Sequence, residues 1–274
     1  MTTDAYSLLK VPIPDQKLIH VHSAESELGK IYLPDIAIHA DPNEFSRCLE
    51  NVSGRWEDWF SSARRKYLDS LIAPKQPSMV DMGLVMQYLQ EVLPSDVIIT
   101  NGAGNFAVWP NKFYQFAGSS RLLAPQSGAM GYGVPAAIAA KSAFPNRTVV
   151  CFAGDGDFQM TCQELSTAAQ IGIFPIILIL NNSTYGTIRV HQEKNYPGRV
   201  SCTDIVNPNF TSLAESFGFL GLRVGTTDEF YVAFESALNS ERGAVLDLNV
   251  SSESLVPRQS LSDIRKNALD NQSK

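Results

Sequence analysis

Two short polar motifs each follow an apolar stretch of this chain, at positions where their side chains could do chemistry together. Gly-Asp-Gly at 154–156 comes directly after residues 147–153, and Asn-Asn at 181–182 comes directly after residues 174–180. The 24 residues 157–180 have room for one helix and a second strand, which predicts a β-α-β unit with parallel strands. Both motifs would then lie at the carboxyl ends of adjacent strands, where open α/β sheets bind ligands.

The residue types in these motifs suit a hard divalent cation bound together with a phosphate. Asp155 offers a carboxylate, Asn182 a carboxamide oxygen and Thr184 a backbone carbonyl, and oxygen atoms are the ligands that such cations prefer. The glycines on either side of the aspartate allow an anion to approach the backbone, and a helix beginning near Asp157 would add free N–H groups. The paired motifs therefore favour a metal–diphosphate site over the alternative, a structural βα turn.

A second glycine-rich turn, Gly102-Ala-Gly104-Asn-Phe-Ala107, follows the predicted strand 96–100 and matches the dinucleotide fingerprint. That fingerprint needs an acidic residue about 20 positions further on to hold the ribose, and residues 97–154 contain neither Asp nor Glu. This excludes the nicotinamide interpretation but leaves a tight loop in which Asn105 donates to a phosphate oxygen. A plain glycine-rich turn is an equal alternative.

Small residues also dominate residues 126–136, just before a predicted helix. They would form a backbone wall against a flat ring, with Met130 as the one bulky side chain beneath it. Close packing of a helix on the sheet is the alternative explanation.

Composition limits the class of protein. The chain has 274 residues, 44% of them hydrophobic, a net charge of −6 and a pI of about 5.3, so it has a large core and no basic tail for nucleic acid. The most apolar run, residues 171–180, is too short to span a bilayer. Because the four cysteines form no Cys-x-x-Cys pair and the start of the chain is not a signal peptide, we expect a cytoplasmic protein.

Strand and helix patterns alternate along most of the chain, which predicts an α/β fold: a doubly wound parallel sheet with helices on both faces, preceded by the remnant of a second α/β domain. The domains expected are a C-terminal remnant of a central domain with a linker helix (1–75), a ligand-binding domain (76–256) and a tail (257–274) that frays from about Asn267. The expected strands are 17–22, 35–39, 96–100, 147–153, 174–180 and 243–250, and the expected helices are 42–52, 56–71, 80–92, 131–143, one between the two motifs, 209–217 and 229–238.

These residues together resemble the C-terminal, diphosphate-binding domain of thiamine-diphosphate enzymes, whose motif is Gly-Asp-Gly followed one helix and one strand later by Asn-Asn. The resemblance covers residues from about 80 to 255. Gly-Ala-Met-Gly-Tyr-Gly at 128–133 and Tyr-Gly-Thr-Ile-Arg at 185–189 bring the chain nearest to acetolactate-synthase-like members. Residues 17–52 are similar to the end of that family's central domain.

The resemblance implies both cofactors and residue roles. Thiamine diphosphate and Mg²⁺ would be bound, with Asp155, Asn182 and the Thr184 carbonyl as metal ligands and Met130 as the prop that bends the cofactor. His191, the only histidine beyond residue 39, is a candidate for handling protons or binding a substrate carboxylate, although an exposed loop histidine is equally compatible with the sequence. The cofactor-binding residues expected are Gly104, Asn105, Gly128, Met130, Gly154, Gly156, Asp157, Asn182, Tyr185 and Gly186.

The activity implied is that of the C-terminal part of an enzyme that decarboxylates a 2-oxo acid such as pyruvate and transfers the resulting enamine to a carbonyl acceptor, as in branched-chain amino acid biosynthesis. The glutamate that activates the cofactor in this family lies on an N-terminal domain, usually of a second subunit. We therefore expect a homo-oligomer, or a partner N-terminal domain that supplies this glutamate.

Two departures from acetolactate synthases keep alternatives open. Residues 105–107 are Asn-Phe-Ala where those enzymes carry Gln-His-Gln, although Trp109 is kept, and His191 stands where they carry a substrate-channel tryptophan. A 2-oxo-acid decarboxylase of the same superfamily and a non-catalytic thiamine-diphosphate-binding module are the two alternatives.

Overall fold

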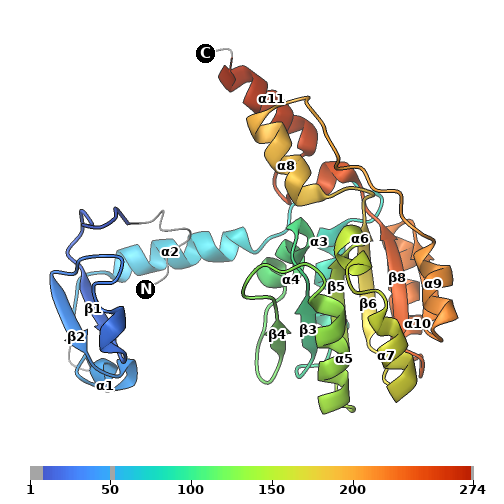
Figure 1. Ribbon diagram of the computed structural model, residues 1–274, viewed down its shortest axis with the longest axis horizontal. Coiled ribbons are helices and arrows are strands. Elements are labelled where there is room, and N and C mark those ends of the chain that lie inside the picture. The colour runs from blue at the N-terminus through green and yellow to red at the C-terminus, as the bar shows by residue number, and fades with distance from the viewer. Residues whose placement is uncertain (1–8, 50–52, 273–274) are drawn as a thin grey trace. The chain divides into compact units, whose positions relative to one another are not determined.

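The computed structural model describes residues 9–49 and 53–272, and contacts divide the chain into two units, Met1–Arg65 and Lys66–Lys274 (Figure 1). The first unit contains two short parallel strands, β1 (Ile19–His22) and β2 (Ile36–His39), and helix α1 (Pro42–Arg47). The predicted helix 42–52 therefore ends earlier than expected, and its last residues, 50–52, lie outside the described residues. Helix α2 (Glu57–Ser70) runs across the division between the units.

The second unit is built on a parallel sheet of six strands in the order β4-β3-β5-β6-β8-β7. Two of these strands, β4 and β7, are short edge strands that the sequence pattern did not predict. The strands are β3 (Ile98–Asn101), β4 (Arg121–Leu123), β5 (Val149–Gly154), β6 (Ile176–Asn181), β7 (Leu220–Val224) and β8 (Ala244–Asn249).

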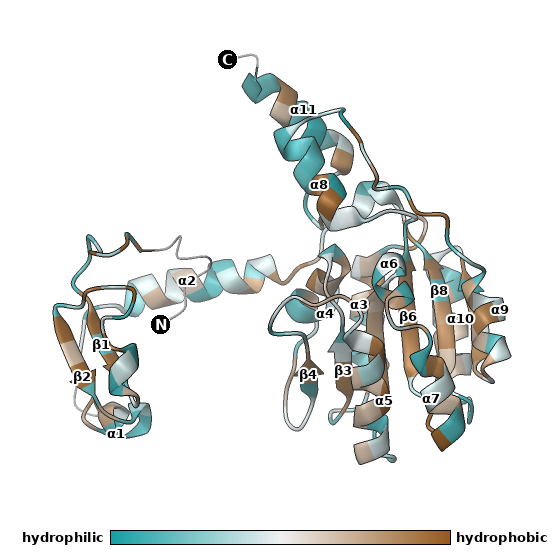
Figure 2. Ribbon diagram, viewed as in Figure 1, coloured by the Kyte–Doolittle hydropathy of each residue, from teal (hydrophilic) through white to brown (hydrophobic). Residues whose placement is uncertain are grey.

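Helices cover both faces of this sheet, which confirms the predicted doubly wound fold (Figure 1). The side chains of β5 alternate between the two faces: Val150 and Phe152 pack in one apolar cluster, and Cys151 and Ala153 pack in the other. Because both faces are covered, β5 is apolar and β6 is apolar up to Leu180, as their colour in Figure 2 shows.

The helices on one face are α3, α4 and α10, and those on the other are α5, α6, α7 and α9. Of these, α4 was not predicted. Their bounds are α3 (Met82–Val92), α4 (Val108–Phe113), α5 (Gly133–Ala143), α6 (Asp155–Gln159), α7 (Glu164–Ile171), α9 (Phe210–Ser216) and α10 (Thr227–Leu238).

The connection between the two motifs differs from the prediction. It holds two helices, α6 and α7, in place of one, and α6 begins at Asp155 and not near Asp157. Phe158 and Leu165 face the sheet as expected, but the buried residue of the last turn is Ala168, while Ala169 is exposed. Because α6 is only five residues long, its macrodipole contributes little at the motif.

The tail is also more ordered than predicted. Helix α11 (Leu261–Gln272) continues beyond Asn267 and packs along α8 (Gly186–Asn195). His191 lies on α8, so it belongs to a helix and not to the exposed loop that was one explanation for this histidine. Leu261 and Ile264 of α11 are buried against Val190 and Leu255, so apolar packing holds the tail in place.

The order of the strands creates a topological switch point. From β3 the chain runs to β4 on one side, and then crosses to β5 on the other side of β3. The loops that follow β3 and β5 diverge at this point and leave a crevice at the carboxyl ends of the strands. No helix among the described residues is long and apolar enough to cross a membrane.

Candidate cofactor-binding site

A cavity of about 290 Å³ lies at the carboxyl ends of the strands and extends to the start of α8. Every residue that the sequence predicted to bind the cofactor or the metal lines it. These residues are Gly104, Asn105, Gly128, Met130, Gly154, Asp155, Gly156, Asp157, Asn182, Thr184, Tyr185 and Gly186. His191 does not line it; this side chain is exposed on α8, so its role in catalysis stays a prediction.

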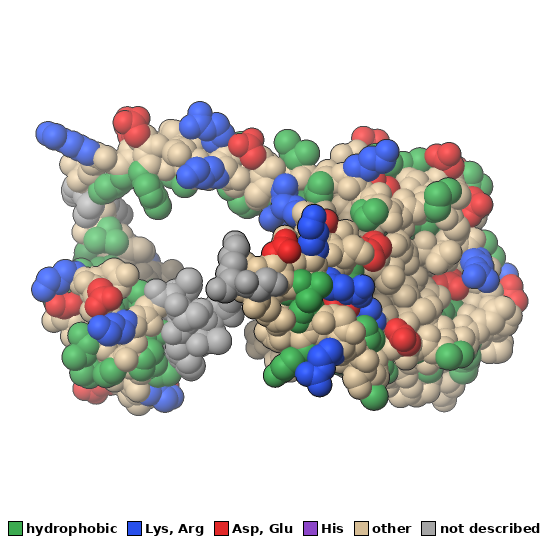
Figure 3. Space-filling model, turned by 90° about the horizontal axis from the view of Figure 1, so that it is seen from above, with side chains coloured by type: hydrophobic (Ala, Val, Ile, Leu, Met, Phe, Trp, Pro, Cys, Tyr) green, Lys and Arg blue, Asp and Glu red, His purple; other side chains and the backbone are tan. Residues whose placement is uncertain are grey.

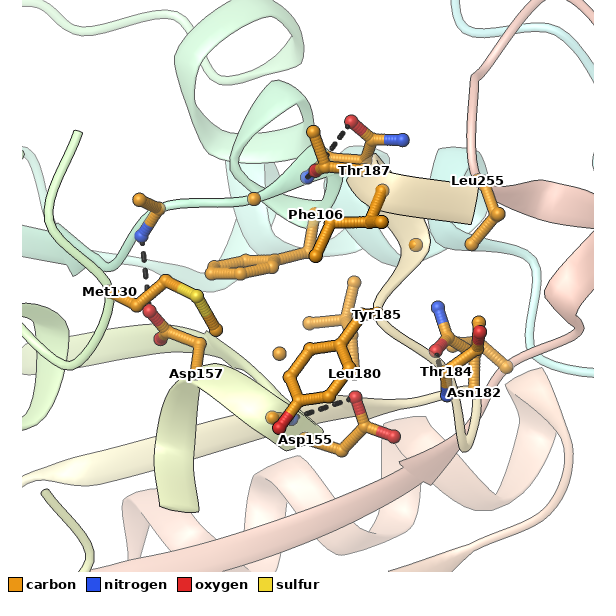
Figure 4. A pocket seen from close by; sticks show the side chains of 18 of the residues that line it. Phe106, Met130, Asp155, Asp157, Leu180, Asn182, Thr184, Tyr185, Thr187 and Leu255 are labelled. Carbon is orange, nitrogen blue, oxygen red and sulfur yellow. Dashed lines mark hydrogen bonds between the residues drawn. The ribbon is translucent and has the colours of Figure 1, made fainter. Parts of the chain in front are cut away.

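The oxygen atoms predicted to bind a cation gather at one end of the cavity. Figure 4 shows Asp155, Asn182 and Thr184 there, while Met130 and Asp157 lie at the other end and the rings of Phe106 and Tyr185 lie between.

Asp155 is 3% exposed, and each of its carboxylate oxygens already accepts one hydrogen bond. Oδ1 accepts from the Gly156 N–H at 2.9 Å, and Oδ2 accepts from Asn207 Nδ2 at 2.8 Å. Burial raises the pKa of Asp155, and these two bonds oppose the rise because they favour the charged form. Because an ionised carboxylate offers several acceptor positions, these bonds do not prevent it from binding a cation.

The turn that follows β6 presents Asn182 and Thr184. The Thr184 N–H donates to Asn182 Oδ1 at 3.0 Å, and between them Ser183 adopts a left-handed conformation with φ of 54°. This conformation turns the chain sharply, so the Asn182 side chain and the Thr184 backbone lie at the same wall of the cavity.

The glycines of the site allow close packing. A Cβ atom at Gly154 would lie 2.8 Å from the Phe106 ring, and one at Gly156 would lie 2.6 Å from the Tyr185 ring. At Gly102 a Cβ atom would overlap the Asp157 carboxylate. Glycine at these positions is therefore needed for the backbone to pack closely against Phe106, Tyr185 and Asp157.

Asp157 joins the two glycine-rich loops. Its Oδ1 accepts from the Ala103 N–H at 3.1 Å and from the Gly131 N–H at 2.8 Å, which holds the loop after β3 and the loop that carries Met130. Its Oδ2 is buried and has no hydrogen-bond partner among the described residues. Burial raises the pKa of Asp157 to about 6, although the two backbone bonds act in the opposite direction.

Asn105 joins the loop after β3 to the start of α8. Its N–H donates to Thr187 Oγ1 at 3.1 Å, and the Thr187 hydroxyl donates to Asn105 Oδ1 at 2.9 Å. The Asn105 side-chain oxygen is therefore engaged with a protein group. Its predicted role as a phosphate donor depends on Nδ2, which has no partner among the described residues.

The donor set fits a divalent cation with a diphosphate group. The cation end offers only oxygen atoms, the ligand type that Mg²⁺ prefers, and too few of them to complete its coordination without ligand oxygens or water. Among the described residues that line the cavity, only Asp155 and Asp157 carry a formal charge. The described lining contains no lysine, arginine or histidine. A bound polyanion would thus need the charge of a metal ion in this pocket.

Some residues of the site gave no usable signal in the sequence. Phe106 lies in the glycine-rich turn 102–107 and Thr187 in the motif 185–189, but whether their side chains line a cavity depends on how two distant loops meet. Asn207 lies outside the predicted motifs and reaches Asp155 from a loop 52 residues further along the chain.

Comparison with known proteins is consistent with this geometry. Residues 102–248 match the family model for the thiamine pyrophosphate enzyme C-terminal TPP-binding domain, thiamine pyrophosphate being another name for thiamine diphosphate. The acetolactate synthase large subunit of Buchnera aphidicola subsp. Schizaphis graminum is 32% identical over 92% of this chain and 46% of its own length.

Two further relatives are also named as large subunits of acetolactate synthases. The acetolactate synthase large subunit of Corynebacterium glutamicum is 32% identical over 89% of this chain and 41% of its own length. The acetolactate synthase isozyme 2 large subunit of Escherichia coli is 27% identical over 86% of this chain and 44% of its own length. The chain thus spans less than half the length of these relatives. Its sheet topology, its paired motifs and these matches show that it belongs to the thiamine pyrophosphate enzyme family, of which it contains the C-terminal TPP-binding domain.

Proposed function

We propose that this chain binds thiamine diphosphate with Mg²⁺ and forms the C-terminal part of an acetolactate-synthase-like enzyme that acts on a 2-oxo acid. The observation that supports this most directly is that the predicted cofactor and metal residues, which come from separate loops, line one cavity at the switch point of the sheet. The relatives are named acetolactate synthase large subunits, which supports this reaction class, and we place the reaction in branched-chain amino acid biosynthesis as part of the proposal.

In this proposal the two ends of the cavity have different roles. Asp155, Asn182 and the Thr184 carbonyl would hold Mg²⁺, whose positive charge would favour binding of the diphosphate. Backbone groups of Gly156 and Asp157 bind the diphosphate. At the other end the Gly128 carbonyl and Met130 hold the aminopyrimidine ring, with Met130 supporting the bent form of the cofactor.

The bound cofactor would supply the electron sink that allows a 2-oxo acid to lose carbon dioxide. The chain's own part is to position the cofactor and exclude water. Phe106 and Leu180 give the cavity an apolar lining, and the bonds between Asn105 and Thr187 close the loop after β3 against α8. The remaining carbon unit would pass to a carbonyl acceptor.

We further propose that residues 1–75 are the remnant of a central domain and a linker helix, and that residues 76–256 form the cofactor domain. The activating glutamate would come from an N-terminal domain, on a partner subunit of a homo-oligomer or on a separate chain. The length of the relatives supports this, because each of them is more than twice as long as the part of it that matches this chain.

The proposal is tested by titrating the 274-residue chain with thiamine diphosphate by calorimetry, with and without Mg²⁺. We expect binding only with the metal, and we expect Asp155→Ala to abolish it while the circular dichroism spectrum and cooperative thermal unfolding are retained. Asp96→Ala is the control: Asp96 is a partly exposed aspartate near Arg147, just before β3, and its loss should leave binding unchanged. Metal-dependent binding of equal affinity by Asp155→Ala would refute the metal assignment.

A further inference from the structure

The loop between α8 and α9 supports the candidate metal site from outside the cavity, through hydrogen bonds made by residues 203–207, here called the 203–207 segment. This segment runs antiparallel to the turn after β6, with a bridge between Thr184 and Asp204. The Tyr185 N–H donates to the Thr203 carbonyl at 2.8 Å, and the Ile205 N–H donates to the Ser183 carbonyl at 2.9 Å. The backbone that presents Thr184 to the cavity is therefore held by the 203–207 segment.

Asn207, at the end of this segment, inserts its amide between the two motifs. Its Nδ2 donates to Asp155 Oδ2 and to Asn181 Oδ1, each at 2.8 Å, and its Oδ1 accepts from Gln159 Nε2 at 2.9 Å. Both protons of the amide nitrogen are thus used, and the oxygen has a donor.

A chain of hydrogen bonds defines the orientation of this amide. Asn181 Nδ2 donates to the buried Asp247 Oδ1 at 2.9 Å, so the Asn181 oxygen must face Asn207. Asn207 must then present its nitrogen to Asn181, and the same nitrogen reaches Asp155. Since an ionised carboxylate only accepts hydrogen bonds, each donor in this series of hydrogen bonds faces an acceptor.

We propose that Asn207 is a positioning residue for Asp155: by holding Oδ2 it fixes the orientation in which the carboxylate would bind the cation. This inference rests on the proposed function, because it assigns Asp155 to the metal. The Gly156 N–H holds one carboxylate oxygen and Asn207 holds the other, so rotation of the carboxylate plane is restricted from both sides. Such outer partners of metal ligands typically change metal affinity about 10- to 100-fold when removed.

The test measures how much Mg²⁺ the chain needs to bind thiamine diphosphate. In Asn207→Ala we expect the half-saturating Mg²⁺ concentration to rise about tenfold or more, while saturating Mg²⁺ restores the wild-type affinity for the cofactor. Electron paramagnetic resonance of Mn²⁺ in the presence of thiamine diphosphate should show the same loss of metal affinity directly.

Asn209→Ala is the matched control, two residues further along the same loop. Asn209 Oδ1 caps α9 by accepting from the Ser212 N–H at 3.0 Å, so its removal should lower the melting temperature without changing the Mg²⁺ requirement. If Asn207 served only folding, Asn207→Ala would likewise lower the melting temperature and leave the Mg²⁺ requirement unchanged.

The outcomes separate this inference from the proposed function. If the wild type binds with Mg²⁺ and Asp155→Ala does not, an unchanged Mg²⁺ requirement in Asn207→Ala overturns the inference alone. Reduced cofactor affinity that saturating Mg²⁺ does not restore also overturns it. A wild-type chain that shows no metal-dependent binding overturns both.

Should Asn207→Ala fail to fold, Gln159→Ala provides the test. It removes only the bond to Asn207 Oδ1 and a longer contact of 3.4 Å to the Asp155 carbonyl, so Asn207 remains but is less restrained. We expect a smaller rise in the Mg²⁺ requirement, of about two- to fivefold, and an unchanged requirement in this variant contradicts the inference.

Discussion

At the scale of single residues, Asp157 has two opposing effects on the candidate site. Its Oδ1 holds the N–H groups of Ala103 and Gly131, and this keeps the two glycine-rich loops in place. Its negative charge, however, lies in the pocket that we propose binds a diphosphate. Since one oxygen accepts both hydrogen bonds, an amide at this position can keep the geometry without the charge.

We therefore expect Asp157→Asn to bind thiamine diphosphate several-fold more tightly than the wild type at pH 7.5, because a like charge is removed from a partly desolvated site. Calorimetry at saturating Mg²⁺ measures this. Asp157→Ala is the companion variant: it loses both hydrogen bonds, so amide exchange at Ala103 and Gly131 should become faster. Weaker binding by Asp157→Asn would contradict the electrostatic argument.

At the scale of elements, the pairing of α8 with α11 depends on a buried acidic residue. Glu193 on α8 is fully buried and accepts hydrogen bonds from Arg265 of α11 at 2.6 and 2.8 Å, from Arg189 at 3.0 Å and from the Gly198 N–H at 2.9 Å. The hydrogen bonds from Arg265 are the largest cause of a Glu193 pKa of about 2. A charged group held by two arginines is thus a strong link between these helices.

This link predicts acid sensitivity of α8 and α11. Because the folded-state pKa of Glu193 lies below its ordinary value of 4.5, its stabilisation is present above pH 4.5 and is lost as the pH falls towards 2. Glu193→Gln should lower the free energy of unfolding by about 2–3 kcal/mol at pH 7, and the difference from the wild type should shrink at pH 3. Denaturant unfolding followed by circular dichroism measures both values.

Asp204→Asn is the control for this prediction. Asp204 also lies near Arg189, at 3.9 Å, but its side chain is 85% exposed, so we expect a change within about 0.5 kcal/mol at either pH. A pH-independent effect of Glu193→Gln would show that its charge does not contribute.

At the scale of the whole molecule, exposed apolar side chains lie beside the cavity, in and near the loop that carries Met130. Met130, Tyr132 and Met160 are 39%, 37% and 47% exposed, and Met160 lies against Gly131 of the same loop. In contrast, Figure 3 shows a face on which acidic and basic side chains are interspersed, without an extended basic patch. The exposed apolar groups beside the cavity therefore suit a protein partner that covers the cofactor site.

We expect the chain to form dimers or tetramers in sedimentation velocity experiments, with these apolar groups in the interface. Met160→Glu should shift the distribution towards monomer, because it places a charge among the apolar side chains. Val232→Glu is the control, since Val232 is 68% exposed on α10, which covers the opposite face of the sheet from α6 and Met160. A wild-type chain that remains monomeric at high concentration would argue against a homo-oligomeric site.

Much of the fold follows from local patterns in the sequence. The long apolar strands β5, β6 and β8, buried on both faces, were predicted because a central parallel strand needs apolar side chains in both directions. The edge strand β4 has only three residues, and β7 is half-buried, so neither has such a pattern. The ordered tail was missed because α11 is mostly polar and is held through α8, a contact that no local pattern reveals.

Local sequence patterns were enough to predict the family of this protein and the residues that line its cavity, because Gly-Asp-Gly and Asn-Asn each follow a buried strand and parallel strands end at the same edge of the sheet. The distant groups that support these residues became apparent only in the folded chain. Asp157 meets Ala103 and Gly131, and Asn207 meets Asp155, through contacts between loops far apart along the chain. The types of these residues suit many partners, and the packing of the loops selects one.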